Sequence, residues 1–250
     1  MKVAPHVIDI LRRAEILPNG IRIVEQLERG VYAEVNKALA AAGFKWAKGP
    51  KCHQHESEES ETALRQLIDT GEVTTAQDIG FFETTGATLD RVIALAHLEP
   101  GLSVLEPSAG TGNMVQRILD AGCRVLAVEF LPRNFKQLAM NITGDGLVAL
   151  CCDFLALDIP DLFDRVVMNP PFAKQVDMDH VLRALAFLRP GGRLVAVMAA
   201  GVTFRENRKT QAFREAIAAH DPVFEALPAG SFKASGTDVN TVILTLVKAS

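Results

Sequence analysis

Long apolar runs and paired cysteines are both missing from this sequence of 250 residues. No apolar run approaches the roughly 20 residues that cross a bilayer, and charges interrupt the apolar N-terminus, so we expect neither a membrane helix nor a signal peptide. The four cysteines, Cys52, Cys123, Cys151 and Cys152, have neither metal-site nor disulfide-framework spacing. These absences predict a cytoplasmic protein with reduced thiols, no metal and no membrane partner.

An excess of positive charge is also lacking. The chain has 26 Lys and Arg against 30 Asp and Glu, which gives a net charge of −4 and a pI of about 5.9. Proteins that coat nucleic acid by bulk electrostatics are basic, so that class is excluded, although a local basic patch is not. The hydrophobic content of 48% is typical of a globular protein. The length allows one large domain and one small domain.

The pattern from residue 76 onward alternates between apolar strand runs and helical periodicity. This alternation predicts a doubly wound, mostly parallel α/β sheet with seven strands, and we assign residues 76–250 to that domain. The last two strands follow one another without a helix between them. We expect helices at about 86–98, 113–122, 132–141, 178–188 and 207–219, and strands at about 102–106, 124–128, 147–151, 164–168, 193–198, 223–227 and 241–247.

Residues 1–75 are predicted to form a small N-terminal α+β domain that could contact the substrate. Residues 1–20 read as an amphipathic segment ending in a turn, and helices are expected over 21–43 and 57–70. The part from 20 to 75 is too small to bury a good core alone. We therefore expect it to pack on the next domain.

Two features of this N-terminal part leave alternatives open. Trp46 lies among Lys45, Lys48 and Lys51. This stretch is either a nucleic-acid contact with a stacking ring or a turn whose Trp fills a domain interface. The CHQH sequence at 52–55 has ligand types at suitable spacing but no second ligand pair, so we predict a solvated loop there.

A glycine-rich turn follows the first predicted strand of the larger domain. Gly110 and Gly112 allow the backbone to turn sharply and to approach a ligand closely. A Rossmann dinucleotide site would have a third glycine where Val115 stands, and no P-loop Gly-Lys-Ser/Thr is present. The turn therefore predicts a ligand site of another kind.

Acidic residues follow three successive predicted strands: Glu106, Glu129 and Asp153. The carboxyl ends of parallel strands meet at one edge of a sheet, which is where open α/β sheets bind their ligands. Glu129 comes about twenty residues after the glycines, where a carboxylate can accept both hydroxyls of a ribose. We expect the three acids to surround one ligand.

The stretch Asn169-Pro170-Pro171-Phe172 ends an apolar run at 166–168. Two prolines stiffen the loop, because each fixes its own φ and restricts the residue before it. Asn169 offers a side-chain acceptor, Pro170 a backbone carbonyl and Phe172 a flat ring. Together they suit a planar group that carries an NH2.

These residues resemble the motifs of class I S-adenosylmethionine-dependent amino-methyltransferases. Asn-Pro-Pro-Phe is similar to their catalytic motif, and the acidic-x-x-x-Gly-x-Gly of 106–112 is similar to their motif I. Residues 81–85 resemble motif X, with Glu83 where the usual form has Pro. The order of the three motifs resembles gamma-type adenine-N6 DNA methyltransferases of phage and plasmid type. The resemblance covers about residues 78–250 and implies a Rossmann-like fold.

The resemblance also implies a site and its cofactor, S-adenosylmethionine. Glu106 would serve the ammonium group of the cofactor, Asp153 its adenine amino group, and Phe130 and Phe154 its adenine ring. The implied catalytic residues are Asn169, Pro170, Pro171 and Phe172, and the implied cofactor-binding residues are Phe82, Thr84, Thr85, Glu106, Ser108, Ala109, Gly110, Gly112, Glu129, Phe130, Asp153, Phe154 and Asn169.

The implied activity is methyl transfer to an exocyclic amino group, with adenine N6 in DNA as the preferred substrate. The target base would flip out and stack on Phe172, with Phe204 or Phe232 on its other face unless these two belong to the core. An RNA base and a protein glutamine amide present similar NH2 groups and stay open as alternatives. So does a non-catalytic binding protein with this fold. The oligomeric state is not predicted.

Overall fold

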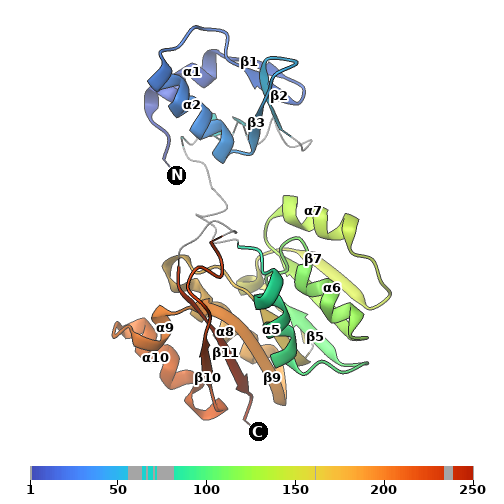
Figure 1. Cartoon of the computed structure of the whole chain (residues 1–250). Coiled ribbons are helices and arrows are strands. Elements are labelled where there is room, and N and C mark those ends of the chain that lie inside the picture. Colours follow the sequence, from blue (N-terminus) through green and yellow to red (C-terminus); the bar gives the residue numbers. More distant parts are fainter. Residues whose placement is uncertain are drawn as a thin grey trace. The chain divides into compact units, whose positions relative to one another are not determined.

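The computed structural model describes residues 2–55, 64–65, 67–69, 71, 82–160, 162–233 and 239–249. The chain divides into two compact units, Met1–Ile79 and Gly80–Ser250, here called the N-terminal and C-terminal units (Figure 1). Most of the helix predicted over 57–70 lies outside the described residues.

In the residues that the structure describes, the N-terminal unit combines helices with a four-stranded antiparallel sheet of order β1-β2-β4-β3. The helix predicted over 21–43 is shorter than expected. Residues 20–22 instead form a strand that pairs with β1 and β4, and the helix begins at Arg29. The elements are α1 (Pro5–Arg13), β1 (Glu15–Leu17), β2 (Gly20–Arg22), α2 (Arg29–Ala41), β3 (Phe44–Ala47) and β4 (Cys52–His55).

The N-terminal unit has a hydrophobic core of its own, but that core is not built from residues 20–75 alone. Helix α1, which lies outside the 20–75 stretch, contributes Val7, Ile8, Ile10 and Leu11 at helical spacing. The other core members come from β2, α2, β3 and the segment around 64–67: Ile21, Val35, Ala38, Leu39, Phe44, Leu64 and Leu67.

The CHQH sequence is not the solvated loop that we predicted. It forms β4, which lies between β2 and β3 in the sheet. Cys52 and His53 are both about 2% exposed. A strand with a neighbour on each side satisfies its backbone groups in the ladder, which a short loop cannot do.

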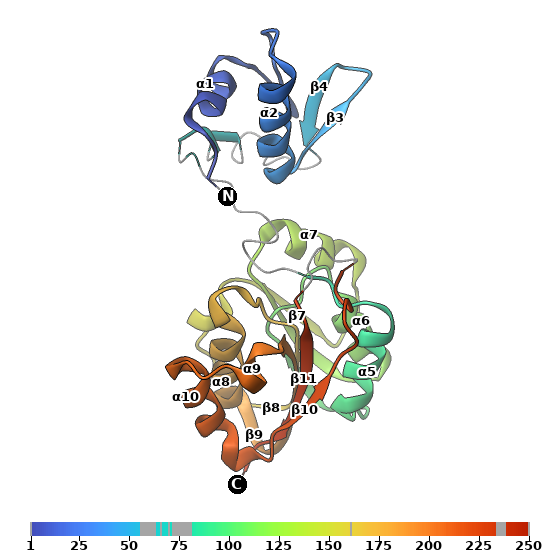
Figure 2. The same ribbon diagram turned by 60° about the vertical axis from the view of Figure 1, so that its left-hand side comes forward.

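The C-terminal unit is a doubly wound α/β domain, and the predicted seven-stranded, mostly parallel sheet is confirmed. The strand order is β10-β11-β9-β8-β5-β6-β7, with β11 antiparallel to β9 and to β10 (Figures 1 and 2). Its elements are α5 (Gly86–Ala96), β5 (Ser103–Glu106), α6 (Asn113–Asp120), β6 (Arg124–Glu129), α7 (Pro132–Asn141), β7 (Leu147–Cys151), η1 (Phe154–Ala156), β8 (Phe163–Met168), η2 (Ala173–Gln175), α8 (Val176–Phe187), β9 (Leu188–Ala199), α9 (Gly201–Phe204), α10 (Arg208–Ile217), η3 (Ala218–His220), β10 (Val223–Ala226) and β11 (Thr241–Val247).

The central strands are apolar on both faces because helices cover both faces of the sheet. In β8, Val166 and Met168 belong to the cluster shared with α8 and α10, whereas Val167 belongs to the cluster shared with α5, α6 and α7. This alternation follows from the two-residue period of a strand. Of the helices in the described part of the chain, none is long and apolar enough to cross a membrane.

The position of the functional site follows from the strand order. From β5 the chain adds β6 and β7 on one side and then returns to place β8 on the other side. The reversal between β5 and β8 is a topological switch point, where the loops after the two strands diverge and leave a crevice. Glu106 ends β5 and Asn169 follows β8.

Gly112 tests how tightly the turn after β5 is packed. It has φ +103°, and a Cβ there would lie 2.7 Å from Ile142 Cγ1, whereas Gly101, with φ +89°, has open space around it. We expect Gly101→Ala to lower the free energy of unfolding by about 1–2 kcal/mol through backbone strain alone. Gly112→Ala should cost about 2–4 kcal/mol because the clash adds to the strain.

Urea unfolding of the two variants, followed at the transition of the C-terminal unit, measures this difference. Equal losses in the two variants would show that Ile142 moves away freely and that the turn is not tightly packed.

Candidate active site

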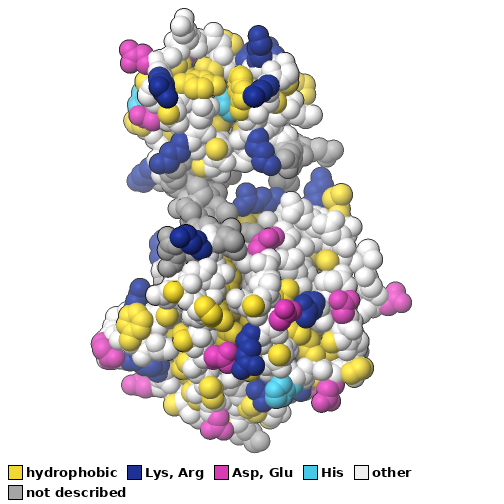
Figure 3. Space-filling view, in the orientation of Figure 1, with side chains coloured by type: hydrophobic (Ala, Val, Ile, Leu, Met, Phe, Trp, Pro, Cys, Tyr) yellow, Lys and Arg dark blue, Asp and Glu magenta, His cyan; other side chains and the backbone are white. Residues whose placement is uncertain are grey.

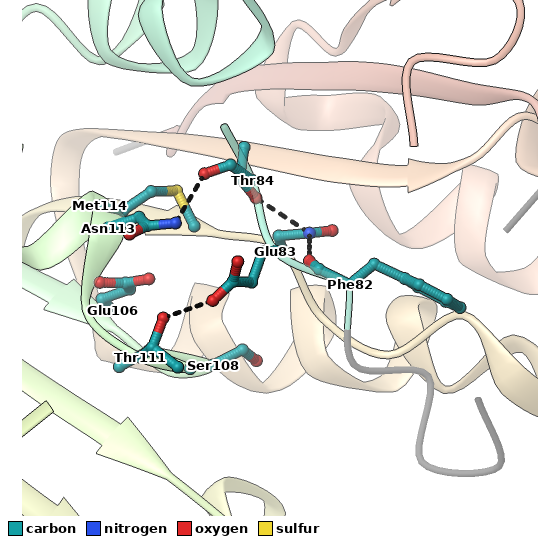
Figure 4. Close-up of a pocket in the computed structure, with 11 residues that line it drawn as sticks. Phe82, Glu83, Thr84, Glu106, Ser108, Thr111, Asn113 and Met114 are labelled. Carbon is teal, nitrogen blue, oxygen red and sulfur yellow. Dashed lines mark hydrogen bonds between the residues drawn. The ribbon is translucent and has the colours of Figure 1, made fainter. Parts of the chain in front are cut away.

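A pocket opens at the switch point and is lined by three segments that are far apart in the sequence (Figure 4). They are the stretch before α5, the turn between β5 and α6, and the residue after β8. The lining residues are Phe82, Glu83, Thr84, Glu106, Ser108, Ala109, Gly110, Thr111, Asn113, Met114 and Asn169. Eight of the predicted site residues are therefore brought together: Phe82, Thr84, Glu106, Ser108, Ala109, Gly110 and Asn169 line the pocket, and Gly112 lies in the same turn.

Hydrogen bonds hold the glycine-rich turn against the neighbouring strand β6. Gly110 and Gly112 have φ of +58° and +103°, a conformation that glycine adopts without strain. The backbone N–H of Ala109 donates to the carbonyl of Val128 at 2.9 Å, and the N–H of Gly110 donates to Glu129 Oε2 at 2.7 Å. The turn therefore keeps its shape without a ligand.

Glu106 is the most unusual electrostatic feature of the pocket. Its side chain is fully buried, and neither carboxylate oxygen has a hydrogen-bond partner among the described residues. Burial, and then the nearby charge of Glu129, raise the pKa of Glu106 to about 8. An unpaired buried carboxyl group is unfavourable, and a cationic ligand would supply the missing partner. The buried carboxyl oxygens of Glu106 therefore fit the ammonium end of S-adenosylmethionine, which would donate hydrogen bonds to them.

Asn169 is held in one orientation by the segment before α5. Its Nδ2 donates to the carbonyl oxygen of Phe82 at 2.7 Å and to Thr84 Oγ1 at 2.9 Å (Figure 4). A carbonyl oxygen can only accept, so the amide cannot be flipped without losing this bond. Asn169 Oδ1 is left buried and without a partner among the described residues. The side chain thus offers an oriented acceptor, as the sequence predicted.

Glu129 anchors the chain itself and does not line the pocket. Its Oε2 accepts from Gly110, and its Oε1 accepts from the backbone N–H of Leu131 at 2.8 Å and from Asn134 Nδ2 at 3.4 Å. Burial raises the pKa of Glu129, while these hydrogen bonds lower it. The ribose contact that we predicted for Glu129 therefore remains a prediction.

The three residues expected around an adenine ring lie in different surroundings. Phe130 is 60% exposed. Asp153 is exposed, and its Oδ1 accepts from the backbone N–H of Leu155 at 2.9 Å. Phe154 differs from the prediction: it is 2% exposed and packs in the core against the rings of His180 and Phe187, so it presents no face to a ligand.

The ring of Phe172 is covered, which differs from the open stacking face that we expected. The Phe82 ring stacks on it with centroids 5.8 Å apart, and Phe232 meets it edge-on at 6.2 Å. Phe172 is 9% exposed and Phe232 is 1% exposed, whereas Phe204 is 67% exposed. A base could reach Phe172 only after Phe82 moves. Pro170 is buried and Pro171 is half-buried in the same loop.

Sequence reasoning missed four pocket residues that connect the segments. Thr111 Oγ1 donates to Glu83 Oε1 at 2.7 Å, and Asn113 Nδ2 lies 3.4 Å from the carbonyl oxygen of Thr84. Met114 also lines the pocket, whereas the predicted Thr85 is exposed and precedes α5. Glu83 carried a signal, since it stands where motif X usually has Pro.

Metal chemistry has no candidate in this part of the chain. Within the described ranges there is no group of three or more His, Cys, Asp or Glu side chains that could hold a metal ion. The ligand-accepting groups of the pocket are carboxylate, amide and hydroxyl oxygens together with backbone atoms.

Comparison with known sequences identifies similar proteins over part of the chain. A sequence family described as "Methyltransferase domain" matches residues 105–196. A probable ribosomal RNA small subunit methyltransferase A of Methanosarcina mazei is 36% identical over 86 residues, 34% of this chain and 31% of the relative. A dimethyladenosine transferase of Eremothecium gossypii is 32% identical over 103 residues, 40% and 31%. The chain thus spans about a third of the length of these curated relatives.

Solved structures share the architecture at low sequence identity. The 23S rRNA methyltransferase ErmE has a TM-score of 0.54 and 21% identity, covering 68% of this chain and 70% of that one. A dimethyladenosine transferase from Plasmodium falciparum has a TM-score of 0.55 and 17% identity, covering 67% and 63%. The chain therefore has the class I methyltransferase fold, and this fold together with the matching family implies S-adenosylmethionine as its methyl donor.

Proposed function

We propose that this protein transfers a methyl group from S-adenosylmethionine to adenine N6 in RNA. The observation that carries the proposal is that Asn169 Oδ1, which is oriented and buried, shares a pocket with the buried carboxyl group of Glu106, and neither group has a hydrogen-bond partner among the described residues. One group is suited to an amine and the other to an ammonium ion. A site with both can hold an amino acceptor and an amino-acid-bearing donor.

The choice of RNA rests on the relatives. Those of Methanosarcina mazei and Eremothecium gossypii are named for ribosomal RNA and for dimethyladenosine. These names support an RNA target over the DNA target that the order of motifs favoured. The net charge of −4 also fits local recognition of a nucleic acid better than coverage of a long duplex.

Asn169 would counter the low nucleophilicity of the target amine. The exocyclic amine of adenine is a poor nucleophile because its lone pair is conjugated with the ring. Asn169 Oδ1 would accept one N–H of this amine, and the carbonyl oxygen of Pro170 would accept the other. Both acceptors interact more strongly as the nitrogen becomes cationic, so they favour the transition state over the ground state.

Glu106 would place the donor. S-adenosylmethionine, when bound, supplies an electrophilic methyl group on a sulfonium ion. The chain contributes a buried carboxylate for the ammonium end, and glycines whose backbone allows close approach. The fixed turn would orient the donor toward Asn169, which lines the same pocket.

The function is tested by labelled methyl transfer from S-adenosylmethionine to separate pools of RNA, DNA and protein, followed by nucleoside analysis. We expect label in RNA as N6-methylated adenosine. Label in DNA would show that the substrate is adenine in DNA, as the order of the motifs favoured. Label in a glutamine amide, or in no pool, would contradict the proposal.

Asn169→Ala should lower kcat on the nucleic-acid substrate by about 10²–10³, because it removes a preorganised acceptor that acts in the transition state. The affinity for S-adenosylmethionine should change little. Asn141, an exposed residue at the end of α7, provides a matched control, and Asn141→Ala should leave both quantities unchanged. Wild-type kcat in the Asn169 variant would refute the mechanism.

Glu106→Gln should make the free energy of unfolding of the ligand-free protein less dependent on pH. It should also weaken the binding of S-adenosylmethionine. Folded Glu106 releases its proton near pH 8, whereas the unfolded chain releases it near the ordinary value of 4.5. The folded state thus binds more protons in this window, so the stability of the wild type should fall as pH rises from about 4.5 to 8. The slope is at most about 1.4 kcal/mol per pH unit, and the variant should lack it.

Urea unfolding at several pH values measures the stability of both proteins, and titration calorimetry at pH 8 measures binding of S-adenosylmethionine. Loss of the ammonium's partner should weaken binding by about 2–5 kcal/mol. Parallel pH profiles for the two proteins, or equal affinities, would remove Glu106 from its assigned role.

A further inference from the structure

The N-terminal unit carries an aromatic cluster at the edge of its sheet. Trp46 in β3 meets His53 edge-on with ring centroids 5.1 Å apart, and Tyr32 of α2 lies on His53 at 6.4 Å. These are the only Trp and the only Tyr of the chain. Trp46 is 49% exposed, so one of the largest apolar side chains is left half in water at an edge strand.

The buried ring of His53 supports the exposed ring of Trp46. His53 is 2% exposed, and its Nε2 lies 2.6 Å from Asn36 Oδ1. Burial lowers the pKa of His53, which keeps its ring neutral at neutral pH. The exposed Trp46 ring therefore rests on a fixed, uncharged support and loses little freedom when a second ring stacks on it.

Positive charge surrounds this cluster. Between Val35 and His55 the sequence has four lysines and no acidic residue, although the whole chain carries a net charge of −4. The four lysines are exposed on α2, on β3 and in the turn to β4: Lys37, Lys45, Lys48 and Lys51. Figure 3 shows Lys and Arg side chains beside exposed hydrophobic side chains on the visible face of this unit.

Elsewhere in the same unit, arginines lie next to acidic side chains. Arg12, Arg13 and Arg22 each form an ion pair with an acid, at 3.4, 2.8 and 2.7 Å. Their partners are Asp9, Glu25 and Glu15. The segment from 35 to 55 thus differs from the rest of the unit in charge as well as in its exposed aromatic ring.

We propose that this surface, the β3–β4 patch formed by Tyr32, Lys37, Trp46, Lys48 and Lys51, binds single-stranded nucleic acid. Trp46 stacks on a base, and the lysines neutralise the phosphates on either side. Stacking needs a base face that is not covered by a neighbour, which favours a single strand over a duplex. The inference rests on the proposed function and assigns part of its substrate recognition to the N-terminal unit.

The single Trp gives a direct readout in the full-length protein. Stacking of a base on an indole ring quenches its fluorescence, and every photon of Trp emission comes from Trp46. Titration with an unlabelled single-stranded oligoribonucleotide should quench this emission at the concentrations where a labelled copy shows binding by anisotropy. Binding without a change in Trp emission would overturn the proposal.

Two sets of variants separate stacking from charge. Trp46→Ala should weaken anisotropy-measured binding about tenfold, whereas Trp46→Phe, which keeps a stacking ring, should retain most of the affinity. Replacing Lys48 and Lys51 by Ala should reduce the slope of log affinity against log salt by about 1. Thermal melting confirms that each variant is folded.

The matched control replaces Arg12 and Arg13 by Ala, which removes the same charge from acid-paired sites of the same unit. It should leave the salt slope nearly unchanged. Equal slopes for the two double variants, or tighter binding of duplex than of single strand, would contradict the proposal.

The outcomes also separate this inference from the proposed function. Quenching by RNA in a protein that transfers no methyl group would sustain the β3–β4 patch and refute the proposed activity. If the protein methylates RNA and the Trp46→Ala variant binds RNA as tightly as the wild type, the proposed activity stands and the β3–β4 patch is refuted. A parallel titration with single-stranded DNA of the same sequence shows whether the patch distinguishes the sugar.

Discussion

One side-chain amide joins two distant segments of the chain at the proposed active site. Asn169, at the end of β8, donates both N–H groups of its amide to the segment before α5, one to the Phe82 carbonyl and one to Thr84. These bonds join parts of the chain that are more than eighty residues apart. They leave Asn169 Oδ1 as an acceptor that has no hydrogen-bond partner among the described residues. The prolines that follow Asn169 stiffen its backbone, so the acceptor is positioned from both sides. Chemistry on an amine needs such an acceptor before the substrate arrives.

The same pocket is electrostatically unfavourable without its ligand. Glu106 is buried with no hydrogen-bond partner among the described residues, and Glu129, which raises the pKa of Glu106 further, accepts hydrogen bonds from the backbone of Gly110 and Leu131. A fold selected only for stability would place an apolar side chain at the end of β5. Functional sites commonly depart from local stability in this way. Glu129 thus holds the turn, whereas the role that we propose for Glu106 is to pair with the ammonium group of the ligand.

Much of the C-terminal unit could be predicted from the sequence because its strands are continuous apolar runs and its helices are periodic. The ends of β5, β6 and β8, which carry Glu106, Glu129 and Asn169, were placed correctly. The rest depended on packing that no local pattern records. Phe154 follows an acid at a strand end in the way that a ligand-stacking ring would, yet from η1 it packs into the core against α8. The stacking of Phe82 on Phe172, and the participation of α1 in a separate N-terminal core, likewise arise from contacts distant in sequence.

Thr84→Val tests most directly whether the orientation of the Asn169 amide controls methyl transfer. The change keeps the shape of a side chain that is 4% exposed and removes only the hydroxyl that accepts from Asn169 Nδ2. We expect a lower single-turnover rate of methyl transfer to RNA, about tenfold or more for the loss of one buried hydrogen bond, with the same methylated nucleoside as product. A single-turnover rate equal to that of the wild type would show that the orientation of the amide does not control the reaction.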